Sequence, residues 1–245
     1  MTEPYELDAC AARDAISKSA LSPVELVSSC ISRIERVDPS LNAVVANCFN
    51  RALDEAKKAE RAVGSGVKLG PLHGLPILIK DLQDTKDLRT TYGSLLYKDH
   101  VPEKDESNVS VLREAGAIIL GKSNTPEFGA GAHTVNKVYG ATGNPFDTNR
   151  TCGGSSGGSA VALAANMVPL ASGSDSGGSL RIPAAYCGVV AHRSTPGIVP
   201  TERHSIGYTN YSVQGPMART VADTQLMLST LARYDDRDPL STPWA

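Results

Sequence analysis

Two glycine- and serine-rich stretches decide the fold of this chain, Gly153-Gly154-Ser155-Ser156-Gly157-Gly158-Ser159 and Ser174-Asp175-Ser176-Gly177-Gly178-Ser179. The apolar segment 160–166 between them is competent to form a helix. Further upstream, Lys80 ends an apolar run that begins at Leu75. Hydroxyls that can attack a carbonyl carbon, glycines that free backbone N–H groups and a desolvated amine are the components of an acyl-transfer site.

Short apolar runs alternate with helical segments from Leu75 onward. We expect strands at 75–79, 117–120 and 167–171 and helices at 107–115 and 158–166. Continuous apolar strands separated by helices are typical of an α/β fold in which both faces of the sheet are covered. The pattern therefore predicts a buried, largely parallel sheet.

The first 66 residues are expected to be mainly helical. Ser22-Pro23-Val24-Glu25 has the composition of a capping box with proline at the first helical position. Apolar residues then recur at helical spacing up to Val37, which predicts one buried helix face. A short strand is expected at 42–47 and an amphipathic helix at 51–63. No repeat or low-complexity linker interrupts the chain, so we expect one domain over 1–245, with a core at 67–245.

Composition restricts the partners. The chain is 41% apolar and 20% charged with a net charge of −2, so it has no basic field to attract nucleic acid directly or an acidic membrane surface. No segment approaches the roughly 20 apolar residues of a membrane span, and the acidic start contains no apolar signal core. These features predict a cytoplasmic protein.

The cysteines and histidines indicate neither disulfides nor metal. The five cysteines form no C-x-x-C pair, and their odd number leaves at least one unpaired, so we expect reduced, mostly buried thiols. The five histidines lack the spacing of zinc ligands. We therefore expect no metal and no cofactor.

One motif match points to nucleotide binding. Gly116 to Ser123 satisfies the G-x-x-x-x-G-K-[ST] pattern of a phosphate-binding loop. Its middle residues, Ala-Ile-Ile-Leu, favour a buried strand rather than a loop that turns its N–H groups inward. The strand is the preferred interpretation.

A second match points to the nucleophile elbow of α/β-hydrolases. Gly153 to Gly157 satisfies G-x-S-x-G, and that scheme needs an acid and then a histidine later in the chain. Asp175 with His192 or His204 has the required order. Such a triad would leave little sheet between its members, so this alternative is the weaker one.

Several segments together resemble the amidase signature family in order and spacing, from about residue 5 to the end of the chain. The matching segments are Gly74 to Asp81, Thr91 to Ser94, Gly121 to Asn124 with Glu127, Gly153 to Ser159, Asp175 to Pro183 and Gly215 to Asp223. The resemblance implies an α/β/α fold with a central mixed sheet flanked by helices, preceded by the N-terminal helical segment.

The resemblance also implies a Ser–cis-Ser–Lys triad. On the matching positions Ser179 is the nucleophile, Ser155 is the bridging serine preceded by a cis peptide bond, and Lys80 is the base. The backbone N–H groups of Ser176, Gly177, Gly178 and Ser179 match the family's oxyanion hole. A lysine serves as a base only when neutral, and burial beside an apolar strand lowers its pKa.

Most other polar residues near the motifs are expected to support the structure rather than to take part in catalysis. Asp175 and Arg181 are expected to form a clamp behind the site. Ser156, Ser159 and Ser176 are interpreted as turn or helix-cap hydroxyls. Lys122 and Arg219 are expected to be solvated or structural, and the role of Asp81 is open.

The chain departs from the family pattern at two places. Cys152 stands where proline usually precedes the Gly-Gly-Ser-Ser run, and Ala191 to Thr195 replaces Gly-Leu-Lys-Pro-Thr. Neither departure touches the triad, but both leave the substrate subclass open.

The resemblance implies an amidase that hydrolyses the C–N bond of a linear amide through a seryl acyl-enzyme. The alternatives are the A subunit of a tRNA-dependent amidotransferase, which works with partner subunits, and a catalytically inactive fragment. Family members continue well past the match to 215–232, so we expect this chain to lack a C-terminal half and to expose an apolar edge. The sequence leaves open whether the chain forms a homo-oligomer.

Overall fold

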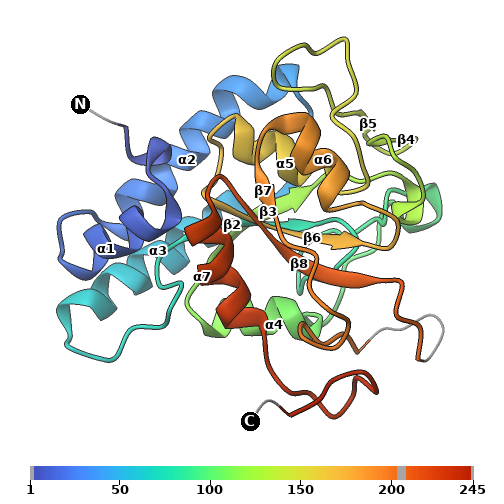
Figure 1. Cartoon of the computed structure of the whole chain (residues 1–245). Helices are drawn as coiled ribbons and strands as arrows, with labels where there is room; N and C mark the ends of the chain where they lie inside the picture. The colour runs from blue at the N-terminus through green and yellow to red at the C-terminus, as the bar shows by residue number, and fades with distance from the viewer. Residues whose placement is uncertain (1–2, 203–207, 244–245) are drawn as a thin grey trace.

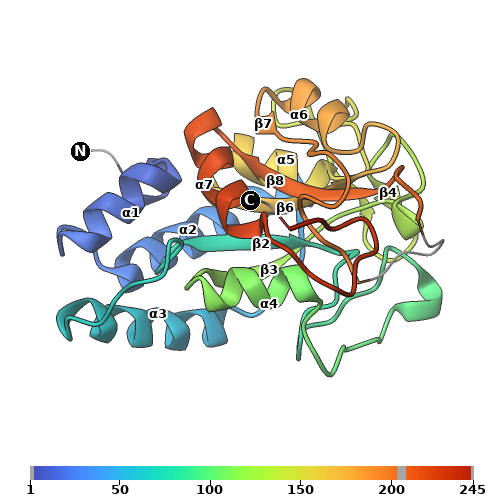
Figure 2. The ribbon, with the colours of Figure 1, turned by 60° about the horizontal axis from the view of Figure 1, so that its bottom comes forward.

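A six-stranded sheet forms the centre of the molecule. The computed structural model describes residues 3–202 and 208–243. The strand order is β1-β3-β2-β6-β8-β7, and α4 lies on the opposite side of the sheet from α5 and α6 (Figures 1 and 2). The strands of this sheet are β1 (Val44–Asn47), β2 (Pro76–Lys80), β3 (Ile118–Ser123), β6 (Leu170–Asp175), β7 (Val190–Ala191) and β8 (Val213–Ala218). A separate two-stranded sheet pairs β4 (Val135–Asn136) with β5 (Gly140–Ala141).

The N-terminal part is mainly helical, as expected. Its α-helices are α1 (Ala9–Ser17), α2 (Pro23–Val37) and α3 (Phe49–Gly64). Ser22 caps α2, because its hydroxyl accepts hydrogen bonds from the N–H groups of Val24 and Glu25. The apolar face of α2 is buried as its periodicity predicts, and α2 packs against α3.

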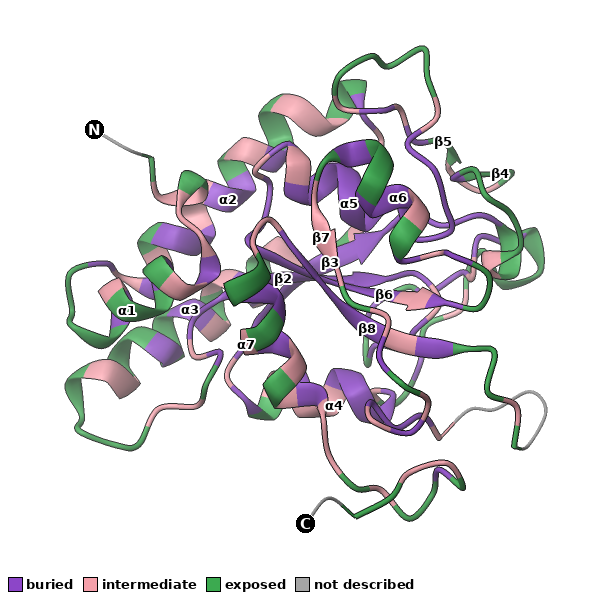
Figure 3. Cartoon of the chain, in the orientation of Figure 1, coloured by how far each residue is buried: buried purple, intermediate pink, exposed green. Residues whose placement is uncertain are grey.

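The sheet is mixed, so the expectation of a largely parallel sheet is wrong. Only β3, β2 and β6 run parallel to one another, whereas β1, β8 and β7 pair antiparallel with their neighbours. The continuous apolar pattern reflects coverage of both faces, and such coverage is compatible with either strand direction. The central strands are buried along most of their length (Figure 3). The mixed sheet agrees with the architecture that the family resemblance implies.

Three central strands extend beyond their predicted apolar runs into polar residues. β2 ends at Lys80, β3 ends at Ser123 and β6 ends at Asp175. Lys80 is in register with Ser123 in the parallel pair of β2 and β3. These polar ends therefore lie at one edge of the sheet. The segment that matches a phosphate-binding loop includes all of buried β3, which confirms the strand interpretation.

The remaining helices cover the sheet and connect its strands. The α-helices are α4 (Ser107–Glu114), α5 (Gly157–Ala164), α6 (Arg181–Cys187) and α7 (Val221–Leu231). The short 3-10 helices are η1 (Pro4–Glu6), η2 (Asp38–Ser40), η3 (Leu95–Tyr97) and η4 (Glu127–Gly129). Within residues 3–202 and 208–243, no helix has the length and apolar character needed to cross a bilayer.

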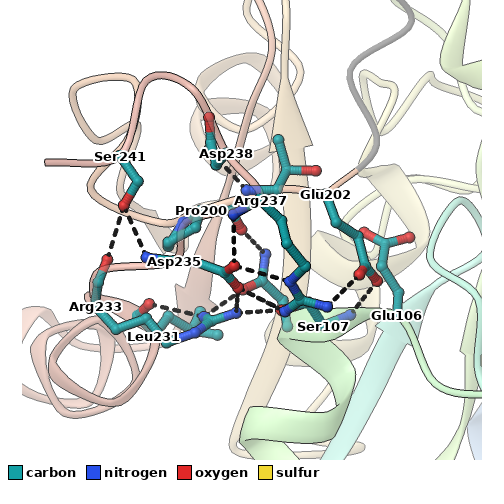
Figure 4. Close-up of polar contacts among 12 residues, drawn as sticks. Glu106, Ser107, Pro200, Glu202, Leu231, Arg233, Asp235, Arg237, Asp238 and Ser241 are labelled. Carbon is teal, nitrogen blue, oxygen red and sulfur yellow. Dashed lines mark hydrogen bonds and ion pairs between the residues drawn. The ribbon is translucent and has the colours of Figure 1, made fainter.

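The segment after α7 returns to the start of α4 and is anchored there by polar contacts (Figure 4). The Arg233 guanidinium donates to Asn108 Oδ1 at 2.8 Å and to the Ser107 hydroxyl. Arg237 binds the Asp235 carboxylate at 2.6 Å and the Glu202 carboxylate at 2.6 Å. The sequence around residue 235 therefore belongs to the packed structure rather than to a loose tail.

Candidate functional site

Lys80 is the centre of the polar edge of the sheet. Its side chain is fully buried, and Nζ lies within hydrogen-bonding distance of three serine hydroxyls. The distances are 2.7 Å to Ser155 Oγ, 2.9 Å to Ser156 Oγ and 2.9 Å to Ser174 Oγ. The structure therefore brings together the lysine at the end of β2 and both glycine- and serine-rich stretches.

The environment of the amine favours its neutral form. Burial lowers the pKa of Lys80 to about 7, although the Asp175 carboxylate acts in the opposite direction. Hydroxyl groups can donate to a neutral amine as well as accept from an ammonium. Lys80 can therefore take up and release a proton near neutral pH.

Ser155 lies in a tight turn that leads into α5. The Gly154–Ser155 peptide bond is cis, and Gly153 has a φ of +78°. A Cβ at Gly153 would lie 3.0 Å from Pro183 Cα, so glycine is needed both for the conformation and for the close approach to α6. Ser155 is 2% exposed. The turn thus presents its hydroxyl to Lys80.

Ser179 lies just before α6 and is half-buried. Its backbone carbonyl accepts a hydrogen bond from Ser156 N–H at 3.2 Å, which ties the two glycine-rich stretches together. In the described part of the chain, no hydrogen bond joins the side chains of Ser155 and Ser179. Of the expected triad, Lys80 and Ser155 are thus in direct contact. Ser179 is held near them through the hydrogen bond of its carbonyl with Ser156.

Ser156 and Ser174 belong to the site although neither was predicted to contact the lysine. The side chain of Ser156 makes no capping hydrogen bond to α5, so its interpretation as a helix cap is wrong. Its hydroxyl instead contacts Lys80 Nζ and donates to the Ser174 carbonyl at 3.2 Å. In the sequence, the only indication that these two serines belong to the site was their position in the two glycine- and serine-rich stretches.

Ser159 is not a helix cap either. Its hydroxyl lies 2.6 Å from Ser123 Oγ and donates to the Ser172 carbonyl at 2.8 Å. It therefore fastens α5 to β3 and β6 beneath the site.

The turn at 176–179 offers backbone N–H groups of two kinds. The Gly178 N–H donates to Asp175 Oδ1 at 2.8 Å and is used within the turn. The N–H groups of Ser176, Gly177 and Ser179 have no acceptor among the described residues. Ser176 and Gly177 are exposed, and a Cβ at Gly177 would meet nothing within 4 Å. This turn can therefore be approached by a ligand.

Asp175, at the end of β6, fixes the same turn by hydrogen bonds to its backbone. Its buried carboxylate accepts from Leu180 N–H at 3.1 Å and from Arg181 Nε at 3.0 Å. Burial raises the pKa of Asp175, but the hydrogen bonds from Arg181 and from the N–H groups of Gly178 and Leu180 outweigh it and lower the pKa to about 2. The clamp between Asp175 and Arg181 is present.

Arg193 is a second cation on Asp175 that sequence reasoning missed. Its guanidinium donates to Asp175 Oδ1 at 2.9 Å and to the Tyr211 carbonyl at 3.0 Å. Arg193 is in the segment that departs from the family pattern. Opposite charges alone could not identify it, because the contact spans β6 and the loop after β7.

We expect Asp175→Asn to destabilise the chain by about 2 kcal/mol, because it removes the charge that two guanidinium groups and three backbone N–H groups share. The contribution of Asp175 to stability should be present above the unfolded-state pKa of about 4 and should be lost as the pH falls toward 2. Urea denaturation of the parent and variant between pH 3 and pH 7 measures this difference. Equal stabilities at pH 7 would show that the clamp contributes nothing.

The nucleophile-elbow alternative lacks its geometry. Asp175 binds Arg181 and Arg193 rather than a histidine, and the His192 side chain is exposed. His204 lies outside the described residues.

Two further charged residues are structural. Lys122 is fully buried, so the expectation that it could be solvated is wrong, and burial lowers its pKa to about 8. Its Nζ donates to the Gln83 carbonyl and to Thr85 Oγ1. Arg219 donates to the Val168 carbonyl at 3.0 Å.

Asp81 accepts from the hydroxyl of Thr91 at 2.6 Å and is thereby fixed behind the end of β2. All five cysteines are free thiols, and Cys30, Cys152 and Cys187 are buried.

A cavity of about 570 Å³ is lined in part by Ser174, near the end of β6. This volume is within the range of small-molecule sites. Both apolar and polar side chains line it, including Leu82, Gln83, Phe128 and Gln214. The cavity therefore has access to the polar edge of the sheet.

Comparison with known proteins gives the class of the chain. The family model for amidases matches residues 25–245, and the chain belongs to this family. The resemblance to the amidase signature family is thereby confirmed, as is its α/β fold.

Individual relatives agree with this assignment. An acylamidase of Rhodococcus erythropolis is 42% identical over 226 residues, which are 92% of this chain and 47% of that protein. The A subunit of the glutamyl-tRNA(Gln) amidotransferase of Picosynechococcus is 42% identical over 221 residues, which are 90% of this chain and 45% of that protein.

Solved structures show the same fold. A bacterial aryl acylamidase of the amidase signature family superposes with a TM-score of 0.92 at 34% identity, covering 97% of this chain and 50% of that one. The peptide amidase of Stenotrophomonas maltophilia gives a TM-score of 0.89 at 36% identity, covering 98% and 51%. The chain thus spans about half the length of the relatives it matches.

Proposed function

We propose that this chain carries the catalytic residues of an amidase that hydrolyses a linear carboxylic amide to a carboxylate and ammonia or an amine. The observation that carries the proposal is the fully buried Lys80 amine among the hydroxyls of Ser155, Ser156 and Ser174. A buried amine with a pKa near 7 is suited to remove a proton from a serine at neutral pH.

In the proposed acylation step, Ser179 Oγ attacks the carbonyl carbon of the amide. Its proton passes through the hydroxyl of Ser155 to Lys80 Nζ, and the carbonyl oxygen becomes an oxyanion. Ser179 is half-buried just before α6, and we propose that substrate binding brings its hydroxyl within hydrogen-bonding distance of Ser155. Catalytic hydrogen bonds often tighten only in the substrate complex.

The oxyanion is proposed to bind at the turn that precedes α6. The N–H groups of Ser176, Gly177 and Ser179 are the donors available there, whereas the Gly178 N–H is held by Asp175. Collapse of the tetrahedral intermediate breaks the C–N bond, and the protonated Lys80 returns the proton to the leaving nitrogen through Ser155. Water then attacks the acyl-enzyme by the same path and releases the carboxylate.

The cavity beside Ser174 is the proposed site for the acyl part of a small-molecule amide. Its size suits a ligand of moderate length, and Leu82 and Phe128 supply apolar contacts. We further propose that the chain works as one domain, in the cytoplasm, without direct binding of nucleic acid or a membrane. A homo-oligomer is compatible with this proposal.

A second candidate is the A subunit of a tRNA-dependent amidotransferase. The similarity to the Picosynechococcus amidotransferase protein favours it as strongly as the acylamidase favours hydrolysis. The two candidates differ in what they need, because an amidotransferase component would depend on partner subunits for its reaction. A catalytically inactive fragment is the third possibility.

Labelling with a fluorophosphonate, followed by mass spectrometry, tests the proposal. The 245-residue chain and a version extended with the second half of the Rhodococcus acylamidase should be compared. We expect an adduct on Ser179 and ammonia release from simple amides, with higher solubility and turnover in the extended form. An adduct on Ser155 or Ser156 would contradict the assignment of the nucleophile. Labelling without ammonia release would favour the amidotransferase component, and no labelling of either form would favour the inactive fragment.

A further inference from the structure

The β2 strand loses its pairing with β6 just before Lys80. The recorded pairs between these strands are Ile77 with Leu170 and Leu78 with Ala171. On the other side, the pairing of β2 with β3 continues to Lys80 and Ser123. Lys80 therefore sits where its strand is held by a backbone ladder on one side only.

A side chain replaces the missing ladder. The backbone N–H of Lys80 donates to Ser172 Oγ at 2.9 Å, and Ser172 is a buried residue of β6. The Ser172 hydroxyl in turn donates to Gln83 Oε1. The gap between the strands is thus bridged by two polar side chains instead of backbone groups.

Gln83 is fixed from several sides and lies in the turn that follows β2. Its backbone N–H donates to the Lys80 carbonyl at 3.0 Å, and its own carbonyl accepts from Lys122 Nζ. Its side-chain Nε2 donates to Gln214 Oε1 at 2.5 Å. The Gln83 side chain is 3% exposed. A buried amide with satisfied donor and acceptor groups is a rigid support.

The network continues away from the site. Gln214 on β8 also accepts from Asn108 Nδ2 at 2.8 Å and donates to Glu106 at the start of α4. Asn108 therefore reaches Gln214 from the side remote from Lys80. This arrangement separates residues that hold Lys80 from residues that only stabilise the fold.

We propose that Gln83 and Ser172 are positioning residues that hold the end of β2 so that the Lys80 amine stays among the serine hydroxyls. Neither residue contacts the amine itself, and both act through the backbone of Lys80. The inference rests on the proposed function only for its kinetic consequence.

The direct test is the titration of Lys80 by NMR in a chain labelled with [13C]lysine, with Lys80→Met to assign the signal. We expect Ser172→Ala and Gln83→Leu to raise the pKa of Lys80 by about one unit, because a loosened strand end admits water to the amine. Asp175, the charged group that acts on this amine, is unchanged in each variant. Ser172→Thr keeps the hydroxyl and should restore the parent pKa.

Asn108→Leu is the matched control. It removes a buried amide from the same network without touching the contacts to Lys80, so it should lower stability and leave the Lys80 pKa unchanged. At pH 7 the phosphonylation of Ser179 should slow about fivefold in Ser172→Ala and Gln83→Leu, because the neutral fraction of Lys80 falls from about one half to about one tenth.

The outcomes separate the two proposals. If the fluorophosphonate does not label the parent but the Lys80 pKa still rises in Ser172→Ala, the positioning role is supported and the proposed chemistry is contradicted. Equal Lys80 pKa values in Ser172→Ala and Asn108→Leu would overturn the positioning role. The same conclusion would follow if the Lys80 pKa in Ser172→Thr equalled that in Ser172→Ala. If Gln83→Leu does not fold, the Lys80 pKa in Ser172→Ala is sufficient to test the proposal.

Discussion

Ser179→Ala is expected to abolish phosphonylation and amide turnover while leaving the fold intact. The substitution removes the hydroxyl that forms the acyl-enzyme, and no other group at that position can replace it. Ser179 is half-buried in a turn, so losing one oxygen creates almost no core cavity and should change stability by less than about 1 kcal/mol. Mass spectrometry of the labelled protein and circular dichroism of the unlabelled protein measure both effects.

Ser176→Ala is the matched control for this variant. Ser176 lies in the same turn, and its backbone N–H rather than its hydroxyl has the proposed role. Labelling should therefore persist in Ser176→Ala. If Ser179→Ala is still labelled at another serine, Ser179 is not the nucleophile.

Lys80→Met should slow acylation by about 10²- to 10⁴-fold, which is the usual contribution of a general base. In the parent, the acylation rate should rise with pH and level off above about 7 as Lys80 loses its proton. The variant lacks the titrating group, so its residual rate should not show this rise. Stopped-flow phosphonylation between pH 5.5 and pH 9 gives the profile, and identical profiles would show that Lys80 is not the base.

The same variant has a signature in stability. The pKa of Lys80 is about 7 in the folded chain and about 10.4 in an unfolded chain, so the unfolded state binds more protons between these pH values. The free energy of unfolding contributed by Lys80 should therefore rise with pH from 7 to 10, and it should be lowest below pH 7. Urea denaturation of Lys80→Met should lack this rise, because methionine does not titrate.

The local chemistry of the site could be predicted from particular residues. The apolar run before Lys80 predicted a buried strand with a desolvated amine at its end, and the fold has both. The glycines at 153 and 178 predicted turns, and both residues have positive φ in the structure. These features depend on a few neighbouring residues, so the chain carries them locally.

Long-range contacts could not be predicted in the same way. Ser174 and Ser156 join the lysine only because β6 and α5 pack against the end of β2. Arg193 reaches Asp175 across the sheet from a segment whose sequence only looked irregular. Gln83 and Ser172 carry no recognisable motif, and their role depends on the separation of two strands.

By itself, the sequence determined the family, the buried strands and the identity of the two glycine-rich turns, because residue type and spacing fix backbone freedom and burial over short distances. The tertiary structure alone decided the strand directions and which three hydroxyls surround Lys80, and it set how far the pKa of that amine falls, to about 7. The physical reason is that desolvation and hydrogen bonding depend on atoms brought together from β2, β6 and the turn before α5, and no single stretch of the chain contains them all.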